Sequence, residues 1–257
     1  MPCVKSLFCN EFIDLMAIYS RILLKLSGEA LASDSNSIDP KTLDKVVSIV
    51  RSALDLDVEV AIVIGGGNIF RGASLAKAGM NRVTGDHIGM LATVMNALAI
   101  ADAFERNQIT STVMSGFPIG GGVCDPVDHK KAKEALSQGT VVIFSAGTGS
   151  PCFTTDTGAA LRAIEVDADV VFKATKVDGI YCSDPAKNPN AVKYDTLSFN
   201  EAIEQNLAVM DTAAFALCRE HNINICVFSM LDDINTLSHI LNGRSVGTTV
   251  SQDGDLT

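Results

Sequence analysis

Glycines, hydroxyl side chains and cations are grouped at four points of the chain, each directly after a short apolar run. Glycine lets backbone N–H groups approach phosphate oxygens closely, a helix N-terminus adds a favourable dipole, and lysine and arginine supply positive charge. The grouping therefore predicts a phosphate-binding site. The four groups are Lys25, Ser27 and Gly28; Gly65, Gly66, Gly67, Asn68 and Arg71; Gly147, Thr148, Gly149, Ser150, Thr154, Thr155 and Asp156; and Thr175, Lys176, Asp178 and Gly179.

Each group taken alone has a simpler structural explanation. Three consecutive glycines are most often a tight turn, Thr154–Asp156 is typical of a helix cap, and Lys25 could be a solvated side chain. Within the predicted site, Asp156 could orient the cations or hold Mg²⁺. The four histidines lack the spacing of metal ligands. The joint occurrence of the four groups, rather than any one of them, favours a functional site.

Seven short runs rich in Val and Ile alternate with helical patterns, which predicts an α/β fold with a mostly parallel central sheet between two layers of helices. In such a sheet ligands bind beyond the carboxyl ends of the strands, so the four groups should converge. In the helix predicted at 86–106, Asp86 is expected as the N-cap, and an apolar stripe comprises Ile88, Leu91, Met95 and Leu98. The predicted strands are Arg21–Leu26, Val58–Ile64, Ile109–Met114, Thr140–Ser145, Asp169–Lys173, Asn224–Phe228 and Gly247–Val250, and the other helices are 40–56, 128–137, 156–167, 199–206, 211–221 and 232–241.

The composition excludes several classes of protein. Of the 257 residues, 47% are apolar and 19% are charged, which is not the composition of a disordered chain. The net charge of −10 argues against nucleic acid or an anionic membrane surface as a partner. Seven scattered cysteines without a C-x-x-C motif indicate neither a zinc site nor a disulfide framework. The longest uncharged run, 88–101, is too short and too polar to span a bilayer, so a soluble cytoplasmic protein is expected.

Two common nucleotide-binding motifs are absent from the sequence. The chain has no Gly-Lys dipeptide and therefore no P-loop, and it has no G-x-G-x-x-G motif. The predicted phosphate site must therefore be of another kind.

Several blocks of the sequence resemble bacterial uridylate kinases, a branch of the amino acid kinase superfamily. They occur in the same order as in that family and span roughly residues 20–251. The part from Met80 to Thr93 resembles the uridylate branch and not the aspartate or acetylglutamate kinases. The matching blocks are Lys25–Leu31, Gly65–Gly72, Ala78–Arg82, Gly85–Thr93, Ser145–Asp156, Lys173–Gly179 and Val209–Asp211.

This resemblance implies an enzyme that transfers the γ-phosphoryl group of Mg-ATP to UMP. It implies a single amino acid kinase-like domain over 21–257, with an acceptor-binding part at 21–155 and an ATP-binding part at 156–257. Residues 1–20 would be an N-terminal extension, expected to be poorly ordered; because 1–15 have no counterpart in the family, Met16 could be the true start. A homohexamer is also implied, and Mg²⁺ is expected with ATP rather than in a metal site of the protein.

The resemblance further implies roles for individual residues. Lys25 would hold the transferred phosphoryl group, and Asp156, Lys173 and Asp211 would complete the charge network around it. Asp86 would accept hydrogen bonds from the ribose of UMP. The implied ATP-binding residues are Lys25, Leu26, Ser27, Gly28, Gly67, Arg71, Thr175, Tyr181 and Asp184, and the implied UMP-binding residues are Gly66, Asp86, Thr148, Gly149, Ser150, Pro151, Cys152, Phe153, Thr154 and Thr155.

The chain departs from the family pattern at two positions of the implied UMP site, where Ser150 replaces a usual Asn and Cys152 a common aromatic residue. Two other functions stay open. One is a nucleotide-binding regulatory or storage protein without catalysis, because fold does not fix function. The other is a kinase of the same superfamily that acts on a carboxylate or a carbamate.

The resemblance also leads to an expectation about regulation. Members of the family that are activated by GTP bind it between subunits through basic residues on and after the long helix. The corresponding positions of this chain are Ala101, Glu105, Thr112 and Thr140, none of which is basic. Weak or absent activation by GTP is therefore expected, because a phosphate-rich effector needs cations.

Overall fold

The computed structural model describes residues 17–70, 79–205, 207, 209–230 and 233–254. Its main feature is a sheet with the strand order β4-β3-β5-β2-β1-β6-β10-β11-β9. Every pairing in this sheet is parallel except the one between β10 and β11. The strands are β1 (Arg21–Leu26), β2 (Glu59–Ile64), β3 (Ser111–Ser115), β4 (Asp125–Pro126), β5 (Val141–Ser145), β6 (Val170–Thr175), β9 (Thr196–Ser198), β10 (Asn224–Ser229) and β11 (Thr248–Ser251), and a separate hairpin pairs β7 (Ile180–Tyr181) with β8 (Lys193–Tyr194).

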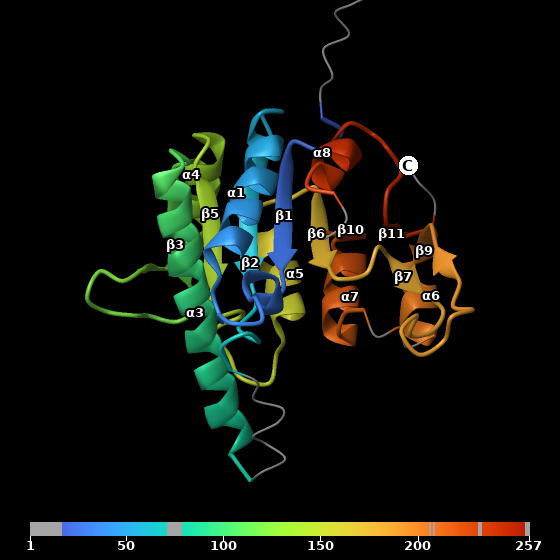
Figure 1. The fold of residues 1–257 in the computed structure, drawn as a ribbon, viewed down its shortest axis with the longest axis horizontal. Helices are drawn as coiled ribbons and strands as arrows, with labels where there is room; N and C mark the ends of the chain where they lie inside the picture. Colours follow the sequence, from blue (N-terminus) through green and yellow to red (C-terminus); the bar gives the residue numbers. More distant parts are fainter. Residues whose placement is uncertain (1–16, 71–78, 206, 208, 231–232, 255–257) are drawn as a thin grey trace, which may run out of the picture.

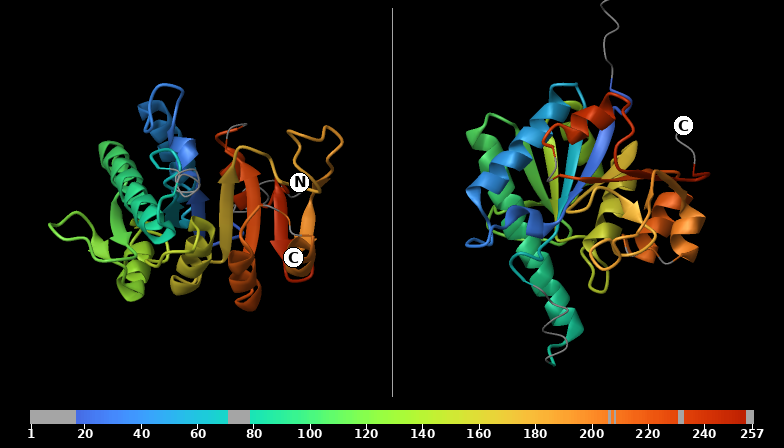
Figure 2. Two further views of the ribbon diagram at one scale, coloured as in Figure 1. Left: turned by 90° about the horizontal axis from the view of Figure 1, so that it is seen from below. Right: turned by 45° about the vertical axis from the view of Figure 1, so that its right-hand side comes forward.

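Helices cover both faces of the sheet, which confirms the predicted three-layer α/β/α sandwich (Figures 1 and 2). Side chains of β1 alternate between two hydrophobic cores: Ile22, Leu24 and Leu26 lie in one and Leu23 lies in the other. The first core is closed by α1 (Pro40–Leu54), α3 (Arg82–Arg106) and α8 (Thr236–Leu241), and the second by α4 (His129–Ser137), α5 (Thr155–Glu165), α6 (Phe199–Glu204) and α7 (Thr212–Glu220). Because both faces are buried, the central strands are apolar throughout.

The seven predicted strands and seven predicted helices are all present, with ends shifted by a few residues. The largest shifts are of four residues: α3 begins at Arg82 rather than at Asp86, and α8 begins at Thr236 rather than at 232. Asn81 is the N-cap, and its side chain accepts a hydrogen bond from the Thr84 N–H. The prediction of Asp86 as N-cap is therefore wrong, because Asp86 lies inside the first turns of the helix and has other partners.

The N-terminal extension predicted at 1–20 is partly corrected by the structure. Residues 1–16 lie outside the described part of the chain, but 17–20 pack on the domain. The Tyr19 ring meets Phe172 edge to face with centroids 5.8 Å apart, and the Ser20 N–H donates to the Asp169 carboxylate. The folded domain therefore begins before β1, because the Tyr19 ring packs on the buried Phe172 and the Ser20 N–H bonds Asp169, the residue before β6.

Helix α3 is long and apolar enough to cross a membrane by length and composition alone. However, half of its most apolar 18-residue window is buried inside the folded domain. The helix therefore serves as a core element of the sandwich, and its composition is weak evidence for a membrane span.

Candidate functional site

Two lysines and one aspartate meet at the carboxyl end of the central strands. Lys25 of β1 and Lys173 of β6 are paired in register, so their side chains emerge side by side. Asp156, in the first turn of α5, lies between them: its Oδ1 is 2.8 Å from Lys25 Nζ and its Oδ2 is 2.7 Å from Lys173 Nζ. All three side chains are largely buried. We call them the Lys-Asp-Lys cluster; it carries one net positive charge at a strand end.

Burial and charge pairing shift the pKa values of the side chains in this cluster in opposite directions. Burial alone would raise the pKa of Asp156, but the two lysine ammonium groups outweigh it and hold that pKa below its ordinary value. Burial lowers the pKa of Lys173, although the Asp156 carboxylate opposes the shift. Asp156 therefore lies between the two cations with its pKa lowered, an arrangement that is consistent with the predicted role of orienting them.

Gly65–Gly67, which we call the phosphate loop, follows β2 at the same edge of the sheet. Two of its contacts leave no room for side chains. A Cβ on Gly28 would lie 2.7 Å from the Gly65 carbonyl oxygen, and a Cβ on Gly66 would lie 2.7 Å from the carbonyl oxygen of Gly89 in α3. Glycine is therefore required where the loop packs between the segment after β1 and helix α3.

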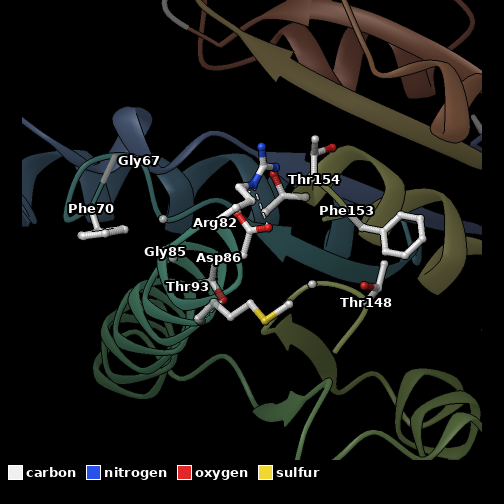
Figure 3. Close-up of a pocket in the computed structure, with 14 residues that line it drawn as sticks. Gly67, Phe70, Arg82, Gly85, Asp86, Thr93, Thr148, Phe153 and Thr154 are labelled. Atoms are coloured by element: carbon white, nitrogen blue, oxygen red, sulfur yellow. Dashed lines mark hydrogen bonds and ion pairs between the residues drawn. The ribbon is translucent and has the colours of Figure 1, made fainter. Parts of the chain in front are cut away.

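A cavity of about 340 Å³ opens between the phosphate loop, the start of α3 and the segment from Gly147 to Thr155 (Figure 3). Its volume falls in the range of small-molecule sites. We call it the acceptor pocket. It is lined by Gly66, Gly67, Phe70, Arg82, Gly85, Asp86, Gly89, Met90, Thr93, Gly147, Thr148, Phe153, Thr154 and Thr155.

Asp86 points into this pocket and joins two of its walls. Both oxygens of its carboxylate accept hydrogen bonds from Arg82 Nε at 2.9 Å, and Oδ2 also accepts the Cys152 N–H at 2.8 Å. Burial would raise the pKa of Asp86, but the Cys152 N–H and the Arg82 guanidinium lower it overall. The ionised Asp86 carboxylate can therefore accept hydrogen bonds from the hydroxyl groups of a small ligand in this pocket.

The strip from Thr148 to Thr155, predicted as the UMP-binding segment, forms one wall of the pocket. Its turns are fixed locally: Thr148 Oγ1 accepts the Ser150 N–H, and Cys152 adopts a positive φ of 73°. Thr154 is the N-cap of α5. Of the predicted strip, Thr148, Phe153, Thr154 and Thr155 line the pocket.

Asp211 is connected to the Lys-Asp-Lys cluster through threonine side chains at the start of α5. It is the N-cap of α7, where it accepts the Ala214 N–H, and it also accepts hydrogen bonds from the hydroxyls of Thr154 and Thr157. Lys173 donates to the Val209 carbonyl oxygen and to Asp156. The predicted charge network therefore reaches Asp211 through the threonines that begin α5.

The predicted ATP-binding residues lie along the ends of β1 and β6 and in the segment that follows β6. Ser27 and Gly28 begin the turn after β1, and Thr175 ends β6, where its hydroxyl donates to the Val177 carbonyl oxygen. Tyr181 donates its hydroxyl to Asp178 at 2.6 Å, and Asp184 pairs with Lys187. One correction concerns Leu26, whose side chain is fully buried in the core, so that its backbone alone is available at this edge.

One predicted residue, Arg71, lies outside the described part of the chain. Other pocket residues lie within the matching blocks but were given no role from the sequence, among them Phe70, Arg82 and Thr93. A signal for Arg82 was present, because it precedes Asp86 by four residues, the spacing at which opposite charges meet on a helix. Thr93 gave no such signal, since its partner lies far away in the sequence.

Among the described residues, no group of three or more His, Cys, Asp or Glu side chains is arranged to hold a metal ion. Both oxygens of Asp156 face lysine ammonium groups. Mg²⁺ is commonly bound by substrate phosphates, waters and one or two carboxylates. The donor set therefore fits a metal that enters on a nucleotide, with Asp156 as the carboxylate at the cluster.

Comparisons with known proteins agree on one family. The Amino acid kinase family matches residues 20–229. The uridylate kinase of Ruthia magnifica subsp. Calyptogena magnifica is 70% identical over 92% of this chain and 99% of its own length, and that of Histophilus somni is 56% identical over 91% and 98%. The structure of UMP kinase from Bacillus anthracis superposes with a TM-score of 0.88 at 39% identity, covering 93% of this chain and 98% of its own. That of UMP kinase from Ureaplasma parvum gives 0.83 at 38% identity over 90% and 98%.

Proposed function

Because this chain belongs to the uridylate kinases of the amino acid kinase family, we propose that it transfers the γ-phosphoryl group of ATP to UMP. An oxygen of the UMP phosphate bonds to the γ-phosphorus while the bond from that phosphorus to the β–γ bridging oxygen breaks, which gives UDP and ADP. The observation that carries this proposal is the position of the Lys-Asp-Lys cluster at the same sheet edge as the phosphate loop and the acceptor pocket.

The site supplies positioning and positive charge rather than a nucleophile or a base. A phosphate monoester has a second pKa of about 6, so its attacking oxygen carries no proton at neutral pH. Asp156, ionised and paired with both lysines, is not needed as a general base. Lys25 and Lys173 neutralise the charge that spreads over the transferring group, and the glycines of the phosphate loop let phosphate oxygens approach its backbone closely. Asp156 is the carboxylate of the cluster that would hold Mg²⁺ brought in on ATP, and the metal would supply further positive charge beside the phosphates.

The acceptor pocket fits a nucleoside monophosphate better than a small acid. Asp86 presents an ionised acceptor for ribose hydroxyls, and Thr155 lines the pocket with a hydroxyl that can hydrogen-bond a base. Phe70 and Phe153 supply aromatic surface. A carboxylate or carbamate acceptor would have no use for most of these groups. A nucleoside monophosphate as acceptor therefore explains more of the residues that line the pocket than a small acid does.

A coupled ADP-release assay tests the proposal. Wild-type protein with Mg-ATP is offered UMP, CMP, AMP, acetylglutamate, aspartate and carbamate in parallel, and Lys25→Met is carried through the same purification to measure contaminating kinases. Turnover with UMP well above the other acceptors is expected. Turnover with CMP, AMP or one of the acids but not with UMP would overturn the substrate, and binding of both nucleotides without turnover would favour a regulatory protein.

We also propose that the enzyme works in the cytoplasm as a homohexamer. The predicted apolar stripe of α3 supports self-association, because three of its members are exposed in the single chain: Leu91 by 49%, Met95 by 54% and Leu98 by 37%. Light scattering should give a mass several times that of one chain, and Met95→Glu should lower that mass without unfolding the protein. A stable, active monomer would contradict the proposal.

A further inference from the structure

Ala146 joins β5 to the wall of the acceptor pocket in a backbone conformation that alanine rarely adopts. It is fully buried and has a φ of 57°, in the left-handed region that favours glycine. The next residues, Gly147 and Thr148, line the pocket. A non-glycine residue stays in this region only when its surroundings hold it there, at a cost of about 1–3 kcal/mol. Some contact must therefore fix Ala146.

Two contacts hold Ala146: its carbonyl oxygen accepts the Gly149 N–H at 2.9 Å, and its N–H bonds the hydroxyl of Thr93 on the inner face of α3. Thr93 is 2% exposed, and its Oγ1 accepts the Ala146 N–H at 2.7 Å while donating to the Met90 carbonyl oxygen at 2.7 Å. Because the hydroxyl proton is directed at Met90, a lone pair is left for Ala146. The methyl group of Ala146 packs in a small cluster with Met90 and Val94 of the same helix. Helix α3 thus holds Ala146 by a hydrogen bond and by packing.

A second bond from α3 holds the other part of the same wall. Asp86 accepts the Cys152 N–H, and Thr93 lies seven residues further along the helix, or about 10 Å at 1.5 Å per residue. The segment 146–152 is therefore attached to one rigid helix at both of its ends.

We propose that Thr93 is a positioning residue for the acceptor nucleotide: through its hydrogen bond to Ala146 it fixes the place of Gly147 and Thr148 in the pocket. This inference rests on the proposed function, because it concerns the same acceptor site. Thr93 acts through Ala146 and not on the reacting phosphate. Its loss should therefore weaken UMP binding while leaving ATP binding unchanged.

The test compares Thr93→Val with Thr93→Ser. Valine keeps the shape of threonine but leaves the buried Ala146 N–H unpaired, whereas serine keeps the hydroxyl. We expect Thr93→Val to raise the KM for UMP roughly tenfold, with the KM for ATP within about twofold of wild type. Thr93→Ser should restore the KM for UMP to within about twofold. If the valine variant is not recovered folded, Thr93→Ala takes its place in the same comparison.

Thr248→Val is the matched control for a purely structural effect. Thr248 is also fully buried, accepts the Ile180 N–H at 2.8 Å and donates to the Tyr194 carbonyl oxygen, but it lies beside the β7–β8 hairpin. Both valine variants should lower the melting temperature, and Thr93→Val alone should raise the KM for UMP. An unchanged KM for UMP in folded Thr93→Val, or an equal rise in Thr248→Val, would overturn the inference. Failure of the wild type to use UMP would instead overturn the proposed function.

Discussion

Asp156 is the residue on which the charge balance of the site depends. It holds Lys25 and Lys173 within hydrogen-bond distance, and without it two buried ammonium groups would face each other. A buried charge that loses its partner costs about 3–5 kcal/mol, while an intact buried pair adds little net stability. The cluster therefore serves to place two cations at the strand ends, and it adds little to the stability of the folded protein.

Lys25→Met should lower kcat about a hundredfold or more and leave the protein folded. Methionine occupies a similar volume, and Asp156 keeps its pair with Lys173. Loss of one charge-assisted contact to the transferring group costs roughly 3 kcal/mol in the transition state, or about a hundredfold in kcat. The measurement is kcat with saturating substrates, alongside the circular dichroism spectrum. A folded variant with near-wild-type kcat would remove Lys25 from the mechanism.

The lowered pKa of Asp156 predicts how stability depends on pH. Because the folded protein holds this carboxylate ionised at pH values where the unfolded chain binds a proton, unfolding takes up a proton in acid. The stabilisation is complete above the usual carboxyl range, about pH 4, and is lost as the pH falls through the folded pKa. Urea unfolding between about pH 6 and 3 should show a shallower loss for Asp156→Asn than for wild type. Parallel curves would show that Asp156 is not the group responsible.

At the scale of elements, α3 organises both substrate-facing segments. Its inner face carries Thr93, which bonds Ala146, and Asn96, which bonds the phosphate loop. Its outer face carries the exposed apolar side chains. A single rigid helix thus sets the position of the phosphate loop relative to the wall of the acceptor pocket.

Replacing Asn96 by leucine should destabilise the protein strongly. Asn96 is fully buried, and its Nδ2 donates to the Gly65 carbonyl oxygen at 2.7 Å and to Asn68 Oδ1 at 2.8 Å. Leucine would leave both acceptors unpaired, at a cost of about 2 kcal/mol or more. Asn107→Leu, which removes one side-chain bond at the end of α3, is the control and should cost less than half as much. Equal losses in urea unfolding would contradict this role of Asn96.

The helices and strands that could be predicted from the sequence are those long enough to show a hydrophobic periodicity. Seven strands and seven helices met that condition, but β4, β7, β8 and β9 have two or three residues each and carry no pattern. The site was predictable where glycines and charges follow strands. Thr93 was not, because it belongs to the site through Ala146, 53 residues away, and that contact exists only once the sheet has formed.

At the scale of the whole molecule, the acidic surface limits which effectors can bind. A hollow at the far end of α3 is lined by Leu98, Ala101, Asp102, Glu105, Gln108, Ile109, Thr110 and Ser111. The charged side chains in this lining are both acidic. Arg106, which lies beside them in the sequence, pairs with Asp102 at 2.9 Å. Of the positions expected to carry cations in a GTP-activated relative, this hollow therefore presents a neutral residue, Ala101, and an acidic one, Glu105.

Millimolar GTP should consequently change kcat by less than about twofold when UMP and ATP are saturating, since an anion gains nothing from like charges. The measurement is the ADP-release rate with and without GTP at fixed free Mg²⁺. As a control for metal depletion, ATP is raised by the same amount. A severalfold rise in kcat with GTP would show that cations from elsewhere complete an effector site.

The central position of β1 in the sheet affects how the chain folds during its synthesis. This strand is near the start of the sequence, yet one of its two partners is β6, where Ile22 pairs with Val170. At the usual rate of synthesis, those 148 residues take on the order of 10 s to be added. Until then one hydrogen-bonding edge of an apolar strand stays open, which is a risk for aggregation. The same pairing sets Lys25 beside Lys173, so the nascent chain brings its two buried lysines together only in the step that closes this open edge.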